Sequence, residues 1–155
     1  MNKRLSPCAG TMMVLLLAGN VFFSANAYAS AARLVLQMDH GLQAGFLRDG
    51  TQLGRGAIVS DEGTGMFQLR SHSLQSDADR GTSHYILTGQ QNAAHQLKVT
   101  LIPVGDTRVQ HSEVYGLVLS GNQNQAHFSV VADGDQQVAA DRYTLRLGGR
   151  TLLLR

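Results

Sequence analysis

The end of the chain alternates apolar and polar side chains with a period of two, and this pattern restricts the chain to β-structure. Residues 143–147 read Tyr-Thr-Leu-Arg-Leu, and successive side chains of a strand point to opposite faces of its sheet. A preceding strand is expected over residues 127–132, with a polar turn at residues 133–137 between the two. After a Gly-Gly pair, apolar residues resume at 152–154 and the sequence stops. We therefore expect this closing apolar strand to lack the neighbour with which it should pair.

Short segments of the same period recur between residues 30 and 126, separated by Gly, Asp, Asn and Ser. This pattern is typical of an all-β sandwich, and no stretch has the spacing of a long amphipathic helix. Strands are expected at residues 32–38, 53–60, 66–70, 83–88, 94–102 and 114–120. The regions 41–50, 71–83 and 104–112 are expected to be loops. We predict one immunoglobulin-like domain, residues 30–155.

Residues 1–29 have the features of a secretory signal peptide. Lys3 and Arg4 precede an apolar run at residues 12–23, and two small-x-small cleavage signatures follow between Ala25 and Ala29. The run is too short for a membrane span. We therefore expect these residues to be removed on export, with 126 of the 155 residues remaining.

The charge and cysteine content of the remaining chain exclude several classes of function. Of the 13 Lys and Arg residues, two lie in the leader, which leaves 11 basic and 11 acidic residues. A net charge of zero gives no reason to expect a nucleic-acid partner. The single cysteine, Cys8, also lies in the leader, so stability must come from packing or from a partner rather than from a disulfide.

No pattern of residues indicates chemistry. The six histidines are scattered, without the spacing that brings two side chains to one metal ion. A Gly-x-Ser-x-Gly motif is missing, and the Asp77-x-Asp79 and Asp133-x-Asp135 pairs do not continue into a calcium loop. We expect neither an enzyme nor a metal or cofactor site.

The first and last strands are the natural borders of a missing strand. We predict an incomplete immunoglobulin-like sandwich that lacks its final (G) strand, although a complete sandwich closed by the chain's own final residues fits the pattern equally well. An inserted strand that buries four or five apolar side chains would contribute on the order of 6–15 kcal/mol. The predicted donor-strand acceptor groove consists of Leu34, Leu36, Phe128, Val130, Tyr143, Leu145, Leu147 and Leu153.

Several short motifs resemble one known family. They are Leu47–Gly50, Gly56–Val59, Thr64–Phe67, Phe128–Gln136 and Tyr143–Gly149. Together they resemble the D-type tip (invasin) subunits of the afimbrial adhesin and Dr fimbriae, to which Saf-type tip subunits are related. The resemblance implies a subunit of the chaperone–usher route whose partners are a periplasmic chaperone, an outer-membrane usher and an adjacent pilin subunit. It also implies export through the periplasm to the fimbrial tip, and a role in host-cell adhesion or invasion.

Two further expectations accompany this resemblance. Ser60 and Thr151 stand where the family usually has two cysteines, so no bridge is expected. The first strand begins close to the expected cleavage site, so the subunit can accept a strand but has none to donate, which favours the tip. A polymerising shaft pilin and a self-contained periplasmic or secreted binding or inhibitor protein are the alternatives. The polar segments 71–83 and 104–112 are candidates for contact with a host-cell receptor.

Overall fold

The computed structural model describes residues 14–21, 32–39, 42–61, 65–71, 75–76, 83–112 and 115–152. Every regular element in these ranges is a β-strand, as the alternation predicted. The strands are β1 (Val14–Val21), β2 (Ala32–Met38), β3 (Leu42–Gln43), β4 (Gly45–Leu47), β5 (Gln52–Ser60), β6 (Met66–Ser71), β7 (Gln75–Ser76), β8 (His84–Thr88), β9 (Gln96–Val104), β10 (Arg108–Ser112), β11 (Gly116–Ser120), β12 (Gln125–Ala132), β13 (Gln136–Val138) and β14 (Arg142–Thr151).

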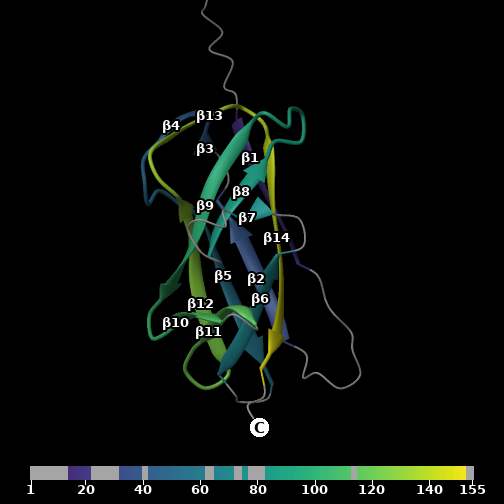
Figure 1. Cartoon of the computed structure of the whole chain (residues 1–155), viewed down its shortest axis with the longest axis vertical. Helices are drawn as coiled ribbons and strands as arrows, with labels where there is room; N and C mark the ends of the chain where they lie inside the picture. The colour runs from purple at the N-terminus through teal and green to yellow at the C-terminus, as the bar shows by residue number, and fades with distance from the viewer. Residues whose placement is uncertain are drawn as a thin grey trace, which may run out of the picture.

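Two sheets of six strands form the two layers of the sandwich. One has the strand order β10-β11-β6-β14-β1-β3, and the other has the order β2-β5-β12-β9-β8-β7. A small third sheet pairs β13 with β4 at one end. In Figure 1, β14 is the long yellow strand along one side of the molecule, with β1 and β2 close to it.

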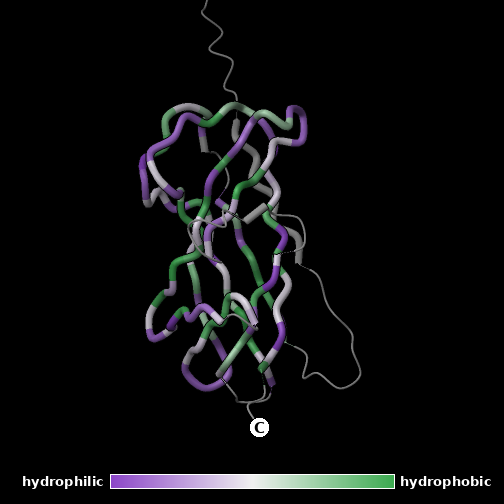
Figure 2. The backbone as a smooth tube through the Cα atoms, in the orientation of Figure 1, coloured by the Kyte–Doolittle hydropathy of each residue, from purple (hydrophilic) through white to green (hydrophobic). Residues whose placement is uncertain are grey.

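The core lies between the two sheets and is built from the inward positions of alternating strands. In β9, Leu97, Val99 and Leu101 are buried, whereas the residues between them are exposed or half-buried. Phe67 and Leu119 face them from the other sheet and are fully buried. The hydrophilic residues gather instead in the turns at the two ends of the sandwich (Figure 2). Burial of one such side chain contributes about 1.5–3 kcal/mol, so this core is the main source of stability.

All three regions expected to be loops contain strands, since β7 lies within residues 71–83 and pairs antiparallel with β8. β10 lies within residues 104–112 and pairs antiparallel with β11, and β3 and β4 lie within residues 41–50. β10 reads Arg-Val-Gln-His-Ser and is a polar edge strand that pairs through its backbone, so it lacks the alternation on which the prediction relied. The glycines at 148 and 149 do not end the last strand either, because β14 continues to Thr151.

A glycine of β5 allows the largest aromatic side chain of β12 to fit in the core. Gly56 pairs with Phe128, and a Cβ placed on Gly56 would overlap the Phe128 ring. The ring is almost fully buried and has little room to move in a close-packed interior.

We therefore expect Gly56→Ala to destabilise the protein by about 1–3 kcal/mol, the usual cost of overpacking. Chemical denaturation of the variant measures this loss. Adding Phe128→Leu to Gly56→Ala should cost less than the sum of the two single changes. Additive losses in this double-mutant cycle would contradict the packing described.

Candidate functional site

The last strand has different partners along its two halves. Residues 147–151 of β14 pair antiparallel with β6. Residues 142–147 pair in parallel with β1, from Leu16 opposite Arg142 to Val21 opposite Leu147. On the other side of this first half, the backbone pairing among the described residues consists of the bridge of Gly89 with Tyr143 and a hydrogen bond from the Gln90 amide to the Arg142 carbonyl. The Gln90 side chain also donates a hydrogen bond to the Thr144 hydroxyl (2.8 Å). The first half of β14 therefore depends on β1 for a regular ladder of backbone hydrogen bonds.

The predicted acceptor residues fall into two groups in the structure. Tyr143, Leu145 and Leu147 of β14 are fully buried, and β2, which carries Leu34 and Leu36, contacts both β14 and β1. These five residues therefore border the position of β1. Leu34 is buried and Leu36 is partly buried against the core.

The remaining predicted acceptor residues lie elsewhere. Phe128 and Val130 belong to β12, and β5 separates that strand from β2. Both side chains are buried in the same core cluster as Tyr143, Leu145 and Leu147. Leu153 lies outside the described residues.

In the full chain, the place of the expected missing strand is held by the chain itself. β1 comes from the apolar run that the sequence analysis assigned to the leader and left out of the fold. It joins β14 on one side and β3 on the other. The full chain is therefore an all-β immunoglobulin-like sandwich in which residues 14–21, and not the final residues, complete the sheet beside β14.

A buried carboxylate anchors the beginning of β14. Asp141 Oδ1 accepts hydrogen bonds from the amides of Gln91 (2.9 Å) and Arg142 (2.6 Å), and Oδ2 accepts one from the amide of Asn92 (3.1 Å). His95 Nδ1 lies 2.9 Å from Oδ2, and the Asp141 side chain is fully enclosed. The strand is thus held at its start by the 89–95 loop, independently of β1.

These contacts also set the protonation of Asp141. Burial alone would raise the pKa of its carboxyl, but the hydrogen bonds from the Gln91 amide, the His95 ring and the other two amides together lower the pKa to about 2. Next to it, burial and the charge of Asp141 raise the pKa of the Tyr143 hydroxyl, which donates a hydrogen bond to the Ala139 carbonyl (2.9 Å).

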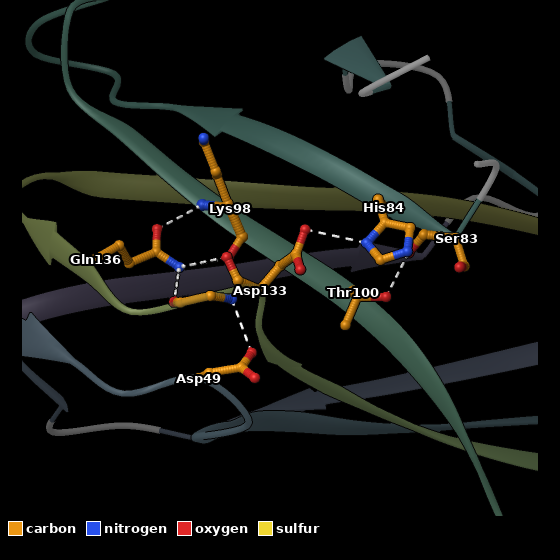
Figure 3. Close-up of polar contacts among 8 residues, drawn as sticks. Asp49, Ser83, His84, Lys98, Thr100, Asp133 and Gln136 are labelled. Atoms are coloured by element: carbon orange, nitrogen blue, oxygen red, sulfur yellow. Dashed lines mark hydrogen bonds and ion pairs between the residues drawn. The ribbon is translucent and has the colours of Figure 1, made fainter. Parts of the chain in front are cut away.

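Two of the sequence motifs meet in one structural unit. The turn at Asp49 and the turn at residues 134–135 exchange hydrogen bonds: the Asp49 amide donates to Asp135 Oδ1, and the Gly134 amide donates to Asp49 Oδ1, both at 2.8 Å. The Gln136 side chain accepts from the Lys98 amide and donates to the Lys98 carbonyl, also at 2.8 Å (Figure 3). The Ala-Asp-Gly-Asp-Gln motif therefore fixes the turn between β12 and β13 against β9 and the β4–β5 turn.

A second His–Asp pair among the described residues lies in the same region. His84 Nδ1 lies 3.0 Å from Asp133 Oδ2, and Figure 3 shows Ser83 and Thr100 close by. The Thr100 hydroxyl donates to the Ser83 carbonyl (3.2 Å), so it serves the backbone. Among the described residues, no three His, Cys, Asp or Glu side chains gather as a metal site. The described part of the chain also contains no helix able to cross a membrane.

The two positions expected to replace cysteines are both buried. Ser60 is 1% and Thr151 7% exposed. The Thr151 hydroxyl has no hydrogen-bond partner among the described residues. Of the candidate receptor loops, most of 71–83 lies outside the described residues, and 104–112 contains β10 and a turn beside the hollows lined by Asp106 and Asn122.

Comparison with known proteins identifies the family. The model of the Enterobacteria AfaD invasin protein family matches residues 43–149, from β3 almost to the end of β14. This match covers well over half of the chain. The chain belongs to the AfaD invasin family. It is a family of fimbrial adhesin subunits and not of enzymes.

Individual relatives agree with this membership. The Escherichia coli protein AggB is 25% identical over 155 residues, 100% of this chain and 99% of AggB. The E. coli protein AfaD is 26% identical over 137 residues, 88% of this chain and 90% of AfaD. The solved Salmonella SafD adhesin is 28% identical, with a TM-score of 0.67 over 78% of this chain and 87% of SafD.

These findings confirm three of the sequence predictions. The resemblance to D-type tip subunits and the immunoglobulin-like all-β fold are correct. The relatives also confirm a fimbrial tip subunit of the adhesin and invasin type, exported through the periplasm to the cell surface.

We expect Asp141→Asn to lower the melting temperature at pH 7, because three amides and His95 lose a charged acceptor. The folded-state pKa of about 2 lies below the ordinary carboxyl value of 3.8. The wild-type contribution is therefore present above about pH 4 and is lost as the pH falls toward 2. Melting curves between pH 7 and 2 should show a smaller loss for the variant.

Asp61 lies in an exposed bend after β5. Asp61→Asn is therefore the matched control, and its melting temperature should follow the wild-type dependence on pH. If Asp141→Asn and the wild type lost stability in parallel below pH 4, the anchoring role of Asp141 would be disproved.

We expect Thr151→Val to stabilise the protein by about 1 kcal/mol, because a buried hydroxyl without a partner costs about 1–3 kcal/mol. Urea unfolding measures the change. Thr151→Ser keeps the hydroxyl and should give no gain. A loss with valine would show that the Thr151 hydroxyl is satisfied in solution.

Proposed function

We propose that this AfaD-family chain is a fimbrial tip subunit that completes its sandwich with a strand from another molecule. Residues 1–29 are removed on export, which empties the place of β1 beside β14. A periplasmic chaperone fills this place first, and the amino-terminal extension of the adjacent subunit replaces it after delivery to the usher. The observation that carries the proposal is the dependence of residues 142–147 on β1 for a regular ladder.

The register of β1 indicates how an incoming strand fits. Leu17, Gly19 and Val21 lie opposite Tyr143, Leu145 and Leu147, whose side chains are all fully buried. These three side chains are buried in the full chain, which includes β1. Removal of β1 therefore exposes this side of β14 to water. A donor with apolar residues at alternate positions would cover the same three side chains.

The free energy that an inserted strand contributes is large relative to the stability of a domain. A strand that buries four or five apolar side chains contributes on the order of 6–15 kcal/mol as an upper estimate. Whole domains are stable by only about 5–15 kcal/mol. The subunit without residues 1–29 is therefore marginal until a donor binds, which makes a chaperone necessary for export.

Contact with the host cell belongs to the same proposal. The family of invasins and the Salmonella relative named as an adhesin support a role in adhesion or invasion. A subunit that accepts a strand without donating one sits at the distal end of a fibre, where its free surfaces meet a host-cell receptor.

A self-contained sandwich is the second candidate, and β1 is the observation that favours it. If residues 14–21 were retained in the exported protein, the sheet beside β14 would be closed by the chain's own strand. Such a protein would need no donor and would act as a free-standing binding protein.

Complementation tests the proposal, and the amino terminus of the exported protein separates the two candidates, because only the self-contained protein retains residues 14–21. Residues 30–155 alone should aggregate or melt at low temperature. Appending residues 14–21 after Arg155 through a flexible linker of about 20 residues, long enough to return along β14 and pair in parallel, should raise the melting temperature by more than about 10 °C. A linker of about four residues lets the fused segment return beside β14 only as an antiparallel strand. The melting temperature of this fusion shows whether the direction of the added strand affects the gain in stability.

Two variants serve as matched controls for this fusion. Leu145→Asn removes a fully buried contact with the donor and should abolish most of the gain, whereas Arg146→Asn changes the exposed neighbouring position and should keep it. If residues 30–155 were as stable alone as with the fused strand, donor complementation would be rejected.

A further inference from the structure

The outward side of β14 carries a line of arginines. Arg142, Arg146 and Arg150 are exposed, whereas the side chains at 143, 145 and 147 are buried in the core. The neighbouring strand β6 adds exposed Arg70, which pairs with Gly148 and therefore lies diagonally next to Arg146 and Arg150. Side chains at opposite and diagonal positions on one face of a sheet are neighbours, so the positive charge continues from β14 onto β6.

The strands of this sheet supply no opposite charge. The six of them contain five arginines, one in β6, one in β10 and three in β14, and no Asp or Glu. Asp106 precedes β10 at the far edge, with β11 and β6 between it and β14, and its carboxylate accepts a hydrogen bond from Asn122 (2.8 Å). The remaining acidic residues of the sequence after residue 29 that lie outside the described ranges are Glu62, Asp77, Asp79 and Glu113.

The other described acidic residues are buried or belong to other parts of the sandwich. The Asp141 side chain is enclosed and bonded to the 89–95 loop. Exposed Asp39 follows β2 in the opposite sheet. The rest lie in the turns after β4, β5 and β12, at residues 49, 61, 133 and 135.

The immediate neighbours of the first two arginines are uncharged. In the ladder with β1, Leu16 is opposite Arg142 and Asn20 is opposite Arg146. On the other side, Gln90 donates to the Arg142 carbonyl and to the Thr144 hydroxyl. The Arg142 guanidinium makes no hydrogen bond or ion pair with a described residue, whereas Arg146 has a further interaction within the chain. Arg142 is therefore the stronger of the two as a contact for the strand that lies beside β14.

We propose that the strand which takes the place of β1 carries a carboxylate on its outer face opposite Arg142, and a second one opposite Arg146. This inference rests on the proposed donor-strand complementation and adds the chemistry of the donor, which is apolar on the side of the core and acidic on the outer side. Opposite charges directly across two strands stabilise their pairing, and like charges weaken it. Because the arginines are four residues apart on one strand, the carboxylates are four residues apart in a donor of either direction.

The arginines give the acceptor position a selectivity that its apolar side lacks. The buried side chains of Tyr143, Leu145 and Leu147 can pack against any strand with apolar residues at alternate positions. A donor with lysines on its outer face would bring like charges to Arg142 and Arg146, and Arg70 would add to the repulsion. Specificity commonly depends on such an unfavourable charge in the wrong partner.

The test uses the full chain, in which β1 holds the place of the donor in a known register. Leu16→Glu/Asn20→Glu and its twin Leu16→Lys/Asn20→Lys place either charge opposite the two arginines. We expect the Glu twin to melt at least about 3 °C above the Lys twin in 20 mM salt. The difference should shrink at 500 mM salt, because exposed charges are screened. Thermal melts followed by circular dichroism measure it.

Two further substitutions locate the effect. Arg142→Gln, introduced into both twins, should remove most of the difference in melting temperature. Arg108→Gln changes an exposed arginine of the same sheet at its far edge. It is the matched control and should leave the difference unchanged.

Equal melting temperatures of the twins, or a difference that persists with Arg142→Gln, would overturn the inference. Equal twins together with binding to phosphatidylserine vesicles that Arg142→Gln abolishes would assign the arginines to an anionic membrane. The same two strands fused after Arg155 of residues 30–155 separate this inference from the proposed function. Equal stabilisation by both fused strands would disprove only the charge preference, whereas no stabilisation by either would disprove the complementation itself.

Discussion

The structure depends on the pairing of one half-strand. Over residues 142–147, the backbone of β14 pairs with β1 on one side and, among the described residues, makes only a single bridge and one further backbone hydrogen bond on the other. Three fully buried side chains of β14 lie along this half. The apolar core therefore extends to the edge of β14 that pairs with β1. An unpaired edge of this kind is a hazard in a free-standing protein and a recognition site in a fibre subunit. Membership of the AfaD invasin family favours the second interpretation.

Several contacts hold β14 in place independently of the strand beside residues 142–147. Asp141 ties the start of β14 to the 89–95 loop through three backbone amides and His95, and β6 pairs with its end. The hydrogen bonds exchanged between the turns at Asp49 and Asp135 stabilise the carboxyl end of β12. The contacts of Asp141 and of β6 hold the two ends of β14 whichever strand lies beside residues 142–147.

Much of the fold could be predicted from the sequence, because inward positions alternate wherever one face of a strand is buried. β2 begins and ends at the predicted residues, 32 and 38, and Leu34, Tyr143, Leu145 and Leu147 are buried at inward positions of the predicted alternation. β10 was missed because an edge strand pairs through its backbone and carries no apolar signal. The anchor at Asp141 was missed because three of its four partners, the Gln91 and Asn92 amides and the His95 ring, lie 46–50 residues away in the sequence. The pairing of β1 with β14 was missed because composition marked residues 1–29 as a leader, and the same apolar run is equally able to form a strand.

Hydrogen exchange of the β14 amides tests the central claim most directly. The comparison is between residues 30–155 alone and the same residues carrying a fused donor strand after Arg155. The account predicts fast exchange at residues 142–147 in the first protein and strong protection in the second, while residues 148–151, paired with β6, stay protected in both. Equal protection of residues 142–147 with and without the donor would show that the chain closes its own sheet, and the account would be wrong.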